Sequence, residues 1–288
     1  MSRTSKKLDK LYKKAPILVF KPGTKLVFFS DHHRGDGEKG SDDFKRNELI
    51  YRKALEWYFE RGYTLVLVGD VEELWECKPL DIFTQYPFIY QLEKKFHDQG
   101  RLIKIVGNHD FIWYNKKNVK KYLNPIFPGI EVYRGISFYL DTGRGTGPRY
   151  FVCHGHQGEF KSDTILNISK FFVRWFWKPF QYAFRTSATS AATNYKKRSK
   201  REKEYCNWVK GKNVRFIVGH THRPRIFSIA KNIVIDDYVL NSSAYVMNTG
   251  CCVFPNECIS AIELSGKHPN VVEFWLENGK LVKKSILK

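Results

Sequence analysis

Five short apolar segments recur along this chain, and each is followed at once by side chains that can bind a metal ion. The segments are rich in β-branched and aromatic residues, which is typical of buried strands. They are Lys25 to Ser30, Thr64 to Val68, Leu102 to Val106, Tyr150 to Cys153 and Val214 to Val218. Amphipathic helical patterns lie between them, at Phe44 to Glu60 and at Phe88 to Gln99. Alternating strands and helices predict an α/β protein.

The C-terminal part has a denser strand pattern without intervening helices. Its segments are Phe227 to Leu240, Ala244 to Asn248, Cys258 to Leu264 and Val271 to Leu276. Such a pattern predicts antiparallel pairing. Because the chain has 288 residues and no internal repeat, we expect residues 1–288 to form a single domain.

The polar residues after the five apolar segments form five clusters. These are Asp31-His32-His33, Gly69-Asp70, Gly107-Asn108-His109-Asp110, His154-Gly155-His156 and Gly219-His220-Thr221-His222. The C-terminal edge of an open α/β sheet is where ligands bind, so the clusters are expected to converge there. Any one of them is most simply a loop, but so many carboxylates and imidazoles at one edge would be costly without a cation. Together they predict a metal site.

The types of ligand narrow the choice of metal. Imidazole nitrogens mixed with carboxylate and carboxamide oxygens favour Mn, Fe, Zn, Co or Ni. The ligands are too many for one ion, whereas two divalent ions about 3.5 to 4 Å apart would use them all. The six cysteines include no CxxC pair, which argues against a structural zinc site and a disulfide framework.

The order of the motifs resembles the calcineurin-like metallophosphoesterase family. The motifs are D-x-H at Asp31 and His33, GD at Asp70, GNHD at 107–110, HGH at His154 and GHxH at 219–222. The resemblance implies a two-sheet α/β/β/α sandwich and a centre with two divalent ions, of which Mn is our first choice. It also implies hydrolysis of a phosphate ester or pyrophosphate by a hydroxide that bridges the ions.

The resemblance also implies a role for each motif residue. The first metal would be held by Asp31, His33 and His222, the second by Asn108, His154 and His220, and Asp70 would bridge the two. His109 would act as general acid, and Asp110 would orient or tune it, with capping of the turn as the alternative for Asp110. His32 is the alternative ligand to His33.

Charged residues beside these motifs are further candidates. Arg34 and Arg223 each adjoin a cluster and are candidates to bind the substrate phosphate, the alternative being that both are solvated loop arginines. His156 and Glu73 are candidates to support a neighbouring ligand.

Residues 161–212 have a composition of their own, with aromatic residues first and charged residues after them. We expect a helical cap inserted in the domain, which packs on the sheet, lines a substrate pocket or rests on an anionic membrane surface. Together with "GDVEELWE" and "GNHDF", the insertion resembles the branch that contains UDP-2,3-diacylglucosamine hydrolase, a peripheral membrane enzyme. That enzyme commonly has Arg where this chain has His109.

The formal net charge of +20 favours attraction to phosphate in nucleic acid, anionic lipid or a small substrate, the alternative being a generally Lys-rich composition without a polyanionic partner. A metal-dependent nuclease acting on DNA or RNA is therefore one alternative function, although no recognised nucleic-acid-binding module accompanies the motifs. A catalytically inactive binding scaffold of the same fold is another. The basic N-terminal segment lacks the features of a signal peptide, so we expect a cytoplasmic protein, with peripheral contact to the inner face of the membrane.

Overall fold

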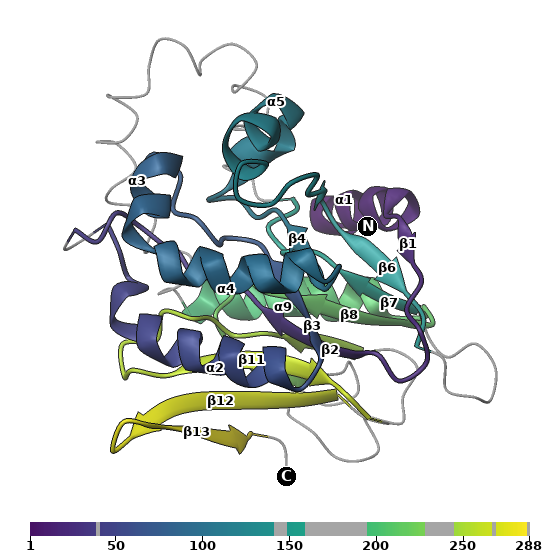
Figure 1. Ribbon diagram of the computed structural model, residues 1–288. Helices are drawn as coiled ribbons and strands as arrows, with labels where there is room; N and C mark the ends of the chain where they lie inside the picture. The colour runs from purple at the N-terminus through teal and green to yellow at the C-terminus, as the bar shows by residue number, and fades with distance from the viewer. Residues whose placement is uncertain (39–40, 141–148, 159–194, 228–244, 267–268, 287–288) are drawn as a thin grey trace.

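Two β-sheets pack face to face, and helices cover both outer faces (Figure 1). The computed structural model describes residues 1–38, 41–140, 149–158, 195–227, 245–266 and 269–286. This arrangement confirms the predicted α/β/β/α sandwich. The helices are α1 (Arg3–Lys14), α2 (Glu48–Glu60), α3 (Pro79–Gln85), α4 (Pro87–Asp98), α5 (Lys116–Asn118) and α9 (Tyr195–Val209), with shorter turns η1 (Lys45–Asn47), η2 (Phe111–Tyr114) and η3 (Val119–Leu123).

The first sheet has seven strands among the described residues, in the order β13-β12-β11-β2-β3-β4-β5. They are β2 (Lys25–Phe29), β3 (Tyr63–Val68), β4 (Leu102–Ile105), β5 (Val132–Tyr133), β11 (Ile259–Leu264), β12 (Pro269–Glu277) and β13 (Lys280–Ser285). The strands β2 to β5 are parallel, whereas β11, β12 and β13 are antiparallel, as the C-terminal pattern predicts.

The second sheet has six described strands, in the order β1-β6-β7-β8-β10-β9. They are β1 (Ile17–Leu18), β6 (Ile136–Phe138), β7 (Arg149–Val152), β8 (Val214–Val218), β9 (Arg225–Phe227) and β10 (Tyr245–Asn248). The three central strands, β7, β8 and β10, are parallel. All five strands predicted to precede a polar cluster are therefore present, three in the first sheet and two in the second.

Alternating side chains assign each strand face to a layer. In β2, Val27 and Phe29 pack under the helices α2 and α4, while Leu26 and Phe28 point to the second sheet. Because successive strand residues point to opposite faces, a strand buried on both sides has a nearly continuous apolar sequence. This explains why the apolar runs of β2 and β3 show no polar alternation.

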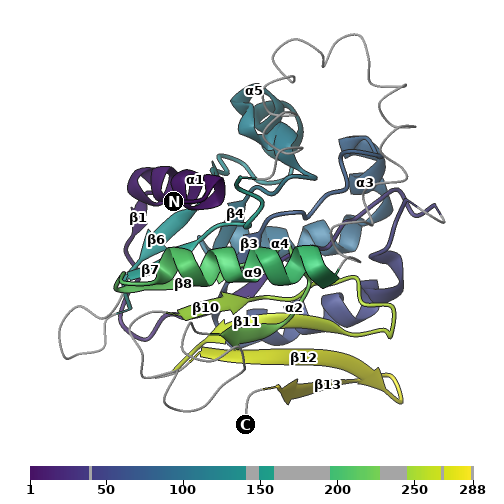
Figure 2. The same cartoon turned by 180° about the vertical axis from the view of Figure 1, so that it is seen from behind.

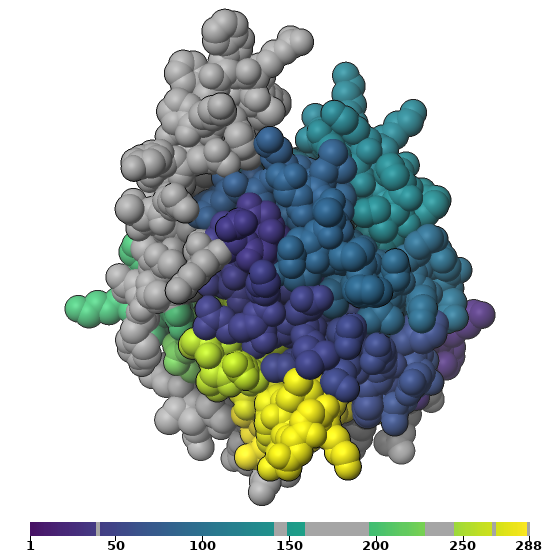
Figure 3. All heavy atoms as spheres, turned by 60° about the vertical axis from the view of Figure 1, so that its left-hand side comes forward, coloured from purple at the N-terminus to yellow at the C-terminus, as the bar shows by residue number. Residues whose placement is uncertain are grey.

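The C-terminal strands complete the layer beneath α2. Figure 3 shows the C-terminal segment (yellow) beside the segment that contains α2 (dark blue). The hydroxyl of Tyr58 donates a 2.7 Å hydrogen bond to Glu263, and the Lys283 ammonium lies 4.2 Å from the centre of the Trp57 ring. These contacts tie β11 and β13 to the core and give this segment a structural role.

Helices α1 and α9 lie together on the outer face of the second sheet (Figure 2). The side chains of Tyr205, Trp208 and Val209 are buried against that sheet, close to Leu8 of α1. Residues 159–194, which make up most of the predicted cap, lie outside the described residues. Residues 195–209, at the end of the predicted cap, form α9 in the helical layer of the sandwich, which agrees with the alternative that the cap packs on the sheet.

Candidate metal centre

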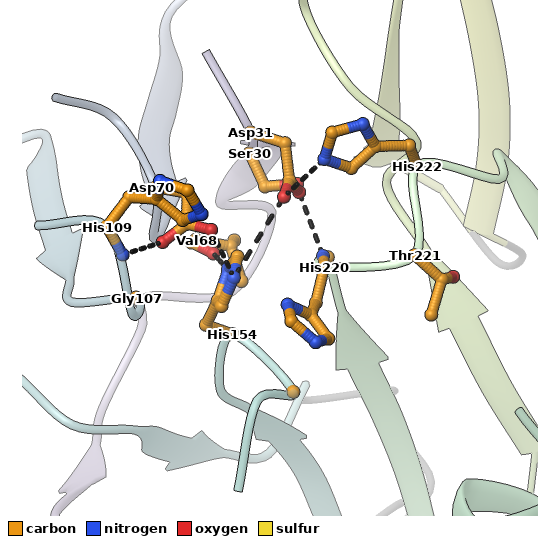
Figure 4. A network of polar contacts seen from close by, with 12 residues as sticks. Ser30, Asp31, Val68, Asp70, Gly107, His109, His154, His220, Thr221 and His222 are labelled. Atoms are coloured by element: carbon orange, nitrogen blue, oxygen red, sulfur yellow. Dashed lines mark hydrogen bonds and ion pairs between the residues drawn. The ribbon is translucent and has the colours of Figure 1, made fainter. Parts of the chain in front are cut away.

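The loops that follow β2, β3, β4, β7 and β8 bring the predicted ligands together at one end of the two sheets (Figure 4). Three groups of described side chains each have their ligand atoms within 4.8 Å of one another, and one of them consists of His33, Glu73 and His109. The other two are Asp31, His33 and His222, and Asp70, His154 and His220. We call these six residues together with Asn108 the His/Asp cluster. Its two groups match the two predicted ligand sets, with the predicted bridging residue Asp70 in place of Asn108 in the second.

The backbone of the His/Asp cluster is unusual. Five of its residues have positive φ angles, between 47° and 68°: Asp31, His33, Asp70, His220 and His222. A non-glycine residue in this region is uncommon, and such strain gathers at functional sites where the surrounding structure enforces it. Here the enforcing contacts include hydrogen bonds from the Asp31 N–H to the Gly69 carbonyl (3.1 Å) and from the His33 N–H to the Asp70 carbonyl (3.0 Å).

Two glycines leave room for the carboxylates of the cluster. A Cβ atom at Gly107 would overlap Asp70 Oδ1, and one at Gly219 would overlap both Ser30 Oγ and Asp31 Oδ2. Any side chain at either position would have to displace a carboxylate or the backbone near it. The glycines of the GNHD and GHxH motifs are therefore required by the close approach of another loop.

The carboxylate of Asp31 is buried and has two different oxygens. Oδ2 accepts hydrogen bonds from the Ser30 hydroxyl and from the His220 backbone N–H. Oδ1 lies 3.0 Å from His222 Nε2 and 3.9 Å from Nε2 of both His33 and His154. Burial opposes ionisation, but the nearby His222 and His154 hold the pKa of Asp31 well below its usual value. Asp31 therefore presents one anionic oxygen to three imidazoles.

The ring of His154 is oriented by the backbone. Its Nδ1 lies 2.8 Å from the Val68 carbonyl oxygen, which can only accept, so Nδ1 carries the proton. The other nitrogen, Nε2, lies 2.9 Å from Asp70 Oδ2. Burial opposes protonation there, yet Asp70 and Asp31 raise the pKa of His154 to about 9. In the neutral ring, Nε2 is the nitrogen left to bind an ion.

Glu73 holds two histidines at once. Its Oε1 lies 2.7 Å from Nδ1 of His109, and its Oε2 lies 2.8 Å from Nδ1 of His33. Burial opposes its charge, but His109 and His33 bring the pKa of Glu73 down to about 2. An ionised Glu73 accepts from both rings and leaves Nε2 as the remaining nitrogen of each. Glu73 thus couples the candidate acid, His109, to the candidate ligand, His33.

The prediction that Asp110 orients His109 is corrected by the structure. Asp110 Oδ1 accepts the Gly107 N–H at 2.6 Å, and Oδ2 accepts the Val71 N–H at 3.0 Å. The carboxylate turns back into the loop because two buried backbone donors need an acceptor there. Asp110 therefore caps the turn, which is the alternative that the sequence left open, and Glu73 contacts the His109 ring instead.

The prediction that Arg34 binds phosphate is also corrected. The Arg34 side chain is fully buried, and both of its Nη atoms donate to the carboxylate of Glu93. The guanidinium also lies between 5.2 and 5.3 Å from the centres of three aromatic rings. Because both Nη atoms are already paired with Glu93 inside the protein and only the buried Nε has no hydrogen-bond partner among the described residues, Arg34 is a structural residue.

The positions of His32 and His33 decide which of the two reaches the cluster, whereas the role of Arg223 stays a prediction. His32 points away from the cluster and is buried near Phe44 and Tyr51, and burial lowers its pKa. His33 is thus the residue that reaches the cluster. Arg223 lies beside His222, is partly exposed, and donates a 3.1 Å hydrogen bond to Glu202. Its predicted contact with phosphate stays a prediction.

Two contributors escaped the sequence analysis. The Trp75 ring stacks on His109 with ring centres 4.0 Å apart, and its Nε1–H donates to the Asn108 carbonyl at 2.7 Å. The hydroxyl of Ser30 donates to Asp31. Neither residue has a diagnostic spacing, because each acts through a side chain that belongs to another residue of the site.

The donor atoms of the cluster fit divalent ions. Four buried ligand atoms form no regular hydrogen bond in the described part of the chain: Asp31 Oδ1, His33 Nε2, Asn108 Oδ1 and His154 Nε2. Two of them have only an ion-pair contact inside the cluster, Asp31 Oδ1 with His222 Nε2 at 3.0 Å and His154 Nε2 with Asp70 Oδ2 at 2.9 Å. An unsatisfied buried polar atom costs about 1 to 3 kcal/mol, so four at one place call for an explanation. All four can offer a lone pair, and coordination of a cation satisfies them together.

Comparisons with solved structures find low identity over most of the chain. Vacuolar Protein Sorting 29 from Cryptosporidium parvum is 12% identical, with a TM-score of 0.43, over 92% of this chain and 97% of that chain. A dimetal phosphatase from Danio rerio is 11% identical, with a TM-score of 0.40, over 92% and 96%. A 5'-nucleotidase from Candida albicans is 11% identical, with a TM-score of 0.38, over 91% and 54%. No curated protein matches the chain.

The sequence itself matches one family model over most of its length. The model of the calcineurin-like phosphoesterases covers residues 24–224, from the start of β2 to the end of the GHxH loop. All five loops of the candidate metal centre lie inside this range. The chain therefore belongs to the calcineurin-like phosphoesterase family.

Proposed function

We propose that this protein is a phosphoester hydrolase that depends on two divalent ions. The observation that carries the proposal is the convergence of four unsatisfied ligand atoms between two groups of imidazoles and carboxylates. We propose Asp31, His33 and His222 for one ion, Asn108, His154 and His220 for the other, and Asp70 between them. Nitrogen and oxygen ligands without a thiolate fit Mn, Fe, Zn, Co and Ni, and we propose Mn first because of the resemblance to the family.

The residues of the cluster prepare the site before substrate binds. When bound, a pair of divalent ions supplies an acidified water and neutralises charge on the phosphoryl oxygens. Ser30, Val68 and Glu73 hold the rings and the Asp31 carboxylate in fixed orientations, so little reorganisation is needed. The neutral Asn108 adds an oxygen ligand without another negative charge that would face an anionic substrate.

His109 is the group that we assign to the leaving oxygen. Its Nδ1–H is held by Glu73 and its ring is stacked on Trp75, so Nε2 is the nitrogen that can give up a proton. We place Arg223 at the edge of the site as a candidate contact for substrate phosphate.

The first experiment is a hydrolysis panel on metal-free protein supplemented with Mn, Zn, Co or Ni. The substrates are an aryl phosphate, an aryl phosphodiester, a UDP-linked pyrophosphate lipid and single-stranded DNA. Metal-dependent cleavage of any of them supports the proposal, and cleavage confined to the UDP-lipid identifies a nucleotide-linked substrate. Preferential cleavage of DNA makes the protein a nuclease. Metal binding without hydrolysis of any substrate leaves a binding scaffold and rejects the proposed activity.

The variant His109→Ala separates acid catalysis from metal binding. We expect it to keep both ions and to lose about 10² to 10⁴ in kcat for leaving groups that need a proton. Aryl phosphates with acidic leaving groups should lose much less. His97→Ala, on the exposed end of α4, is the control. Equal losses for good and poor leaving groups would remove His109 from the role of general acid.

A further inference from the structure

The two helical layers of the sandwich differ sharply in charge. On the second sheet, α1 and α9 contain twelve Lys and Arg residues and three acidic residues. On the first sheet, α2 and α4 contain four Lys and Arg residues and five acidic residues. Much of the net charge of +20 is therefore concentrated on one side of the molecule.

The cations of α1 and α9 form two exposed rows. They recur at every third or fourth residue, so they share the outward side of each helix. The exposed members are Arg3, Lys6, Lys7, Lys10, Lys13 and Lys14 in α1, and Lys196, Lys197, Lys200 and Lys203 in α9. We call these ten residues the basic face. The two helices are in contact with each other and lie side by side on the second sheet (Figure 2).

The acidic residues of the two helices do not offset this charge at the surface. Asp9 accepts a 2.8 Å hydrogen bond from Trp208, and Glu204 pairs with Arg201 at 3.1 Å. Glu202 is buried and pairs with Arg223 at 3.1 Å. Glu204 also accepts a 2.8 Å hydrogen bond from the Thr4 hydroxyl of α1, so all three carboxylates have partners within the protein. Arg3, Lys7 and Lys197 have contacts within the protein, and the other seven exposed cations of the basic face repel one another and are stabilised by an anionic partner.

Exposed apolar residues lie close to α1 in the sequence. Met1 precedes α1 and is 81% exposed, and Ile17 and Val19, shortly after the helix, are 52% and 93% exposed. In contrast, the described aromatic side chains of the two helices, Tyr12, Tyr205 and Trp208, are buried or half-buried. Lysines beside exposed apolar side chains suit the interface of an anionic bilayer, whereas single-stranded nucleic acid is usually held by exposed aromatic rings.

We propose that the basic face docks on an anionic membrane surface, with Ile17 and Val19 inserted at the interface. In the described part of the chain, no helix has both the length and the apolar character needed to span a bilayer. The contact is therefore peripheral and electrostatic, and it weakens as salt concentration rises. This inference does not rest on the proposed function, because none of the residues that carry it belongs to the metal centre.

The test is co-sedimentation of the full chain with vesicles of phosphatidylcholine, with or without phosphatidylglycerol. We expect binding only to the anionic vesicles. The triple variant Lys10→Gln, Lys200→Gln, Lys203→Gln should lower the partition coefficient about 100-fold, since each cation near the surface contributes roughly fivefold. The control triple, Lys95→Gln, Lys280→Gln, Lys284→Gln, removes the same charge from α4 and β13 and should have little effect. Equal loss in both triples would overturn the proposal.

Two further measurements distinguish the membrane from a nucleic acid. Val19→Ser should weaken vesicle binding several-fold, because it removes an inserted apolar group, and should leave binding to a labelled RNA oligomer unchanged. RNA binding at a salt concentration where anionic vesicles do not bind would overturn the proposal. Hydrolysis of a soluble aryl phosphate is measured alongside and should be the same in both triple variants, which keeps this test separate from that of the enzyme activity.

Discussion

Two groups of buried charged residues lie side by side in this protein, and they differ in how their polar atoms are satisfied. In the first, which we call the ionic network, Arg34 pairs with Glu93 and Lys104 pairs with Glu72. Each carboxylate oxygen of the network has at least one donor. In the His/Asp cluster, four ligand atoms form no regular hydrogen bond among the described residues. Burial alone therefore does not mark a ligand site, whereas convergent unsatisfied lone pairs do.

The two groups also depend on each other. Two backbone hydrogen bonds join Arg34 of the network to the loop that follows β3. The Arg34 N–H donates to the Val71 carbonyl at 3.0 Å, and the Glu73 N–H donates to the Arg34 carbonyl at 2.9 Å. Positive φ angles at Asp31 and Asp70 cost free energy. The ionic network is joined to these loops by the two hydrogen bonds of Arg34, and we expect it to hold them in that conformation.

The largest expected effect is that of Asp70→Asn. This change removes the charge proposed to lie between the two ions, so we expect both ions to be lost or mispositioned and turnover to fall by about 10³ or more. Metal content is measured by inductively coupled plasma mass spectrometry, with the exposed Asp98→Asn as control. Two ions per chain in the Asp70 variant would contradict the bridging assignment.

Breaking the ionic network should lower the free energy of unfolding more than it lowers the rate of hydrolysis. Glu93→Ala leaves the buried Arg34 without its partner, and we expect a loss of about 3 to 5 kcal/mol in the free energy of unfolding. The exposed pair of Lys94 and Asp98 is the matched comparison, and Asp98→Ala should cost less than about 1 kcal/mol. Denaturant titration measures both. Similar losses in the two variants would mean that the network does not support the fold.

Glu73 connects the two groups, and its removal should have an intermediate effect. In Glu73→Gln, the amide has one acceptor oxygen and can no longer accept from both His33 and His109. We expect metal affinity and kcat each to fall by about 10- to 100-fold, with folding retained. Metal titration and steady-state kinetics measure the two effects, with the exposed Glu56→Gln as control. An unchanged kcat would show that His109 needs no carboxylate partner.

The smallest expected effect is a dependence on pH. The stability of the metal-free protein should fall as pH rises, whereas the affinity for metal should increase. The raised pKa of His154, about 9, means that the charged pair with Asp70 stabilises the metal-free protein fully below about pH 6.5. That stability is lost as pH rises through 9. Metal must displace the same proton, so metal affinity should rise by up to about tenfold per pH unit between 7 and 9. Calorimetric titration in buffers of different ionisation enthalpy measures the released proton, and metal binding without proton release would contradict this assignment.

Side-chain direction could not be predicted for the loop residues. Asp110 follows His109 directly, so sequence proximity favoured a contact between them. The contact instead comes from Glu73, 36 residues away in the chain. Arg34 adjoins the metal motif in sequence, yet its guanidinium turns into the helical layer toward Glu93. In each case, the partner that decides the direction lies on a different element.

The position of α9 shows the same limit for a whole segment. Its many lysines and arginines resemble the end of a solvent-exposed cap, because only a few apolar residues mark its buried side. Tyr205 and Trp208 nevertheless pack on the second sheet, and the lysine rows form the outward side of the helix. The composition of the segment did not indicate which surface the helix covers.

The sequence by itself determined the alternation of strands and helices, the strands that precede the motifs and the family. It could do so because strand periodicity and short motifs are local, whereas the division of the motif strands between two sheets is not. Only the tertiary structure decided which acid holds His109, which arginine is buried and where the basic residues gather. Those outcomes depend on hydrogen bonds and packing between segments far apart in the chain, and no local pattern records them.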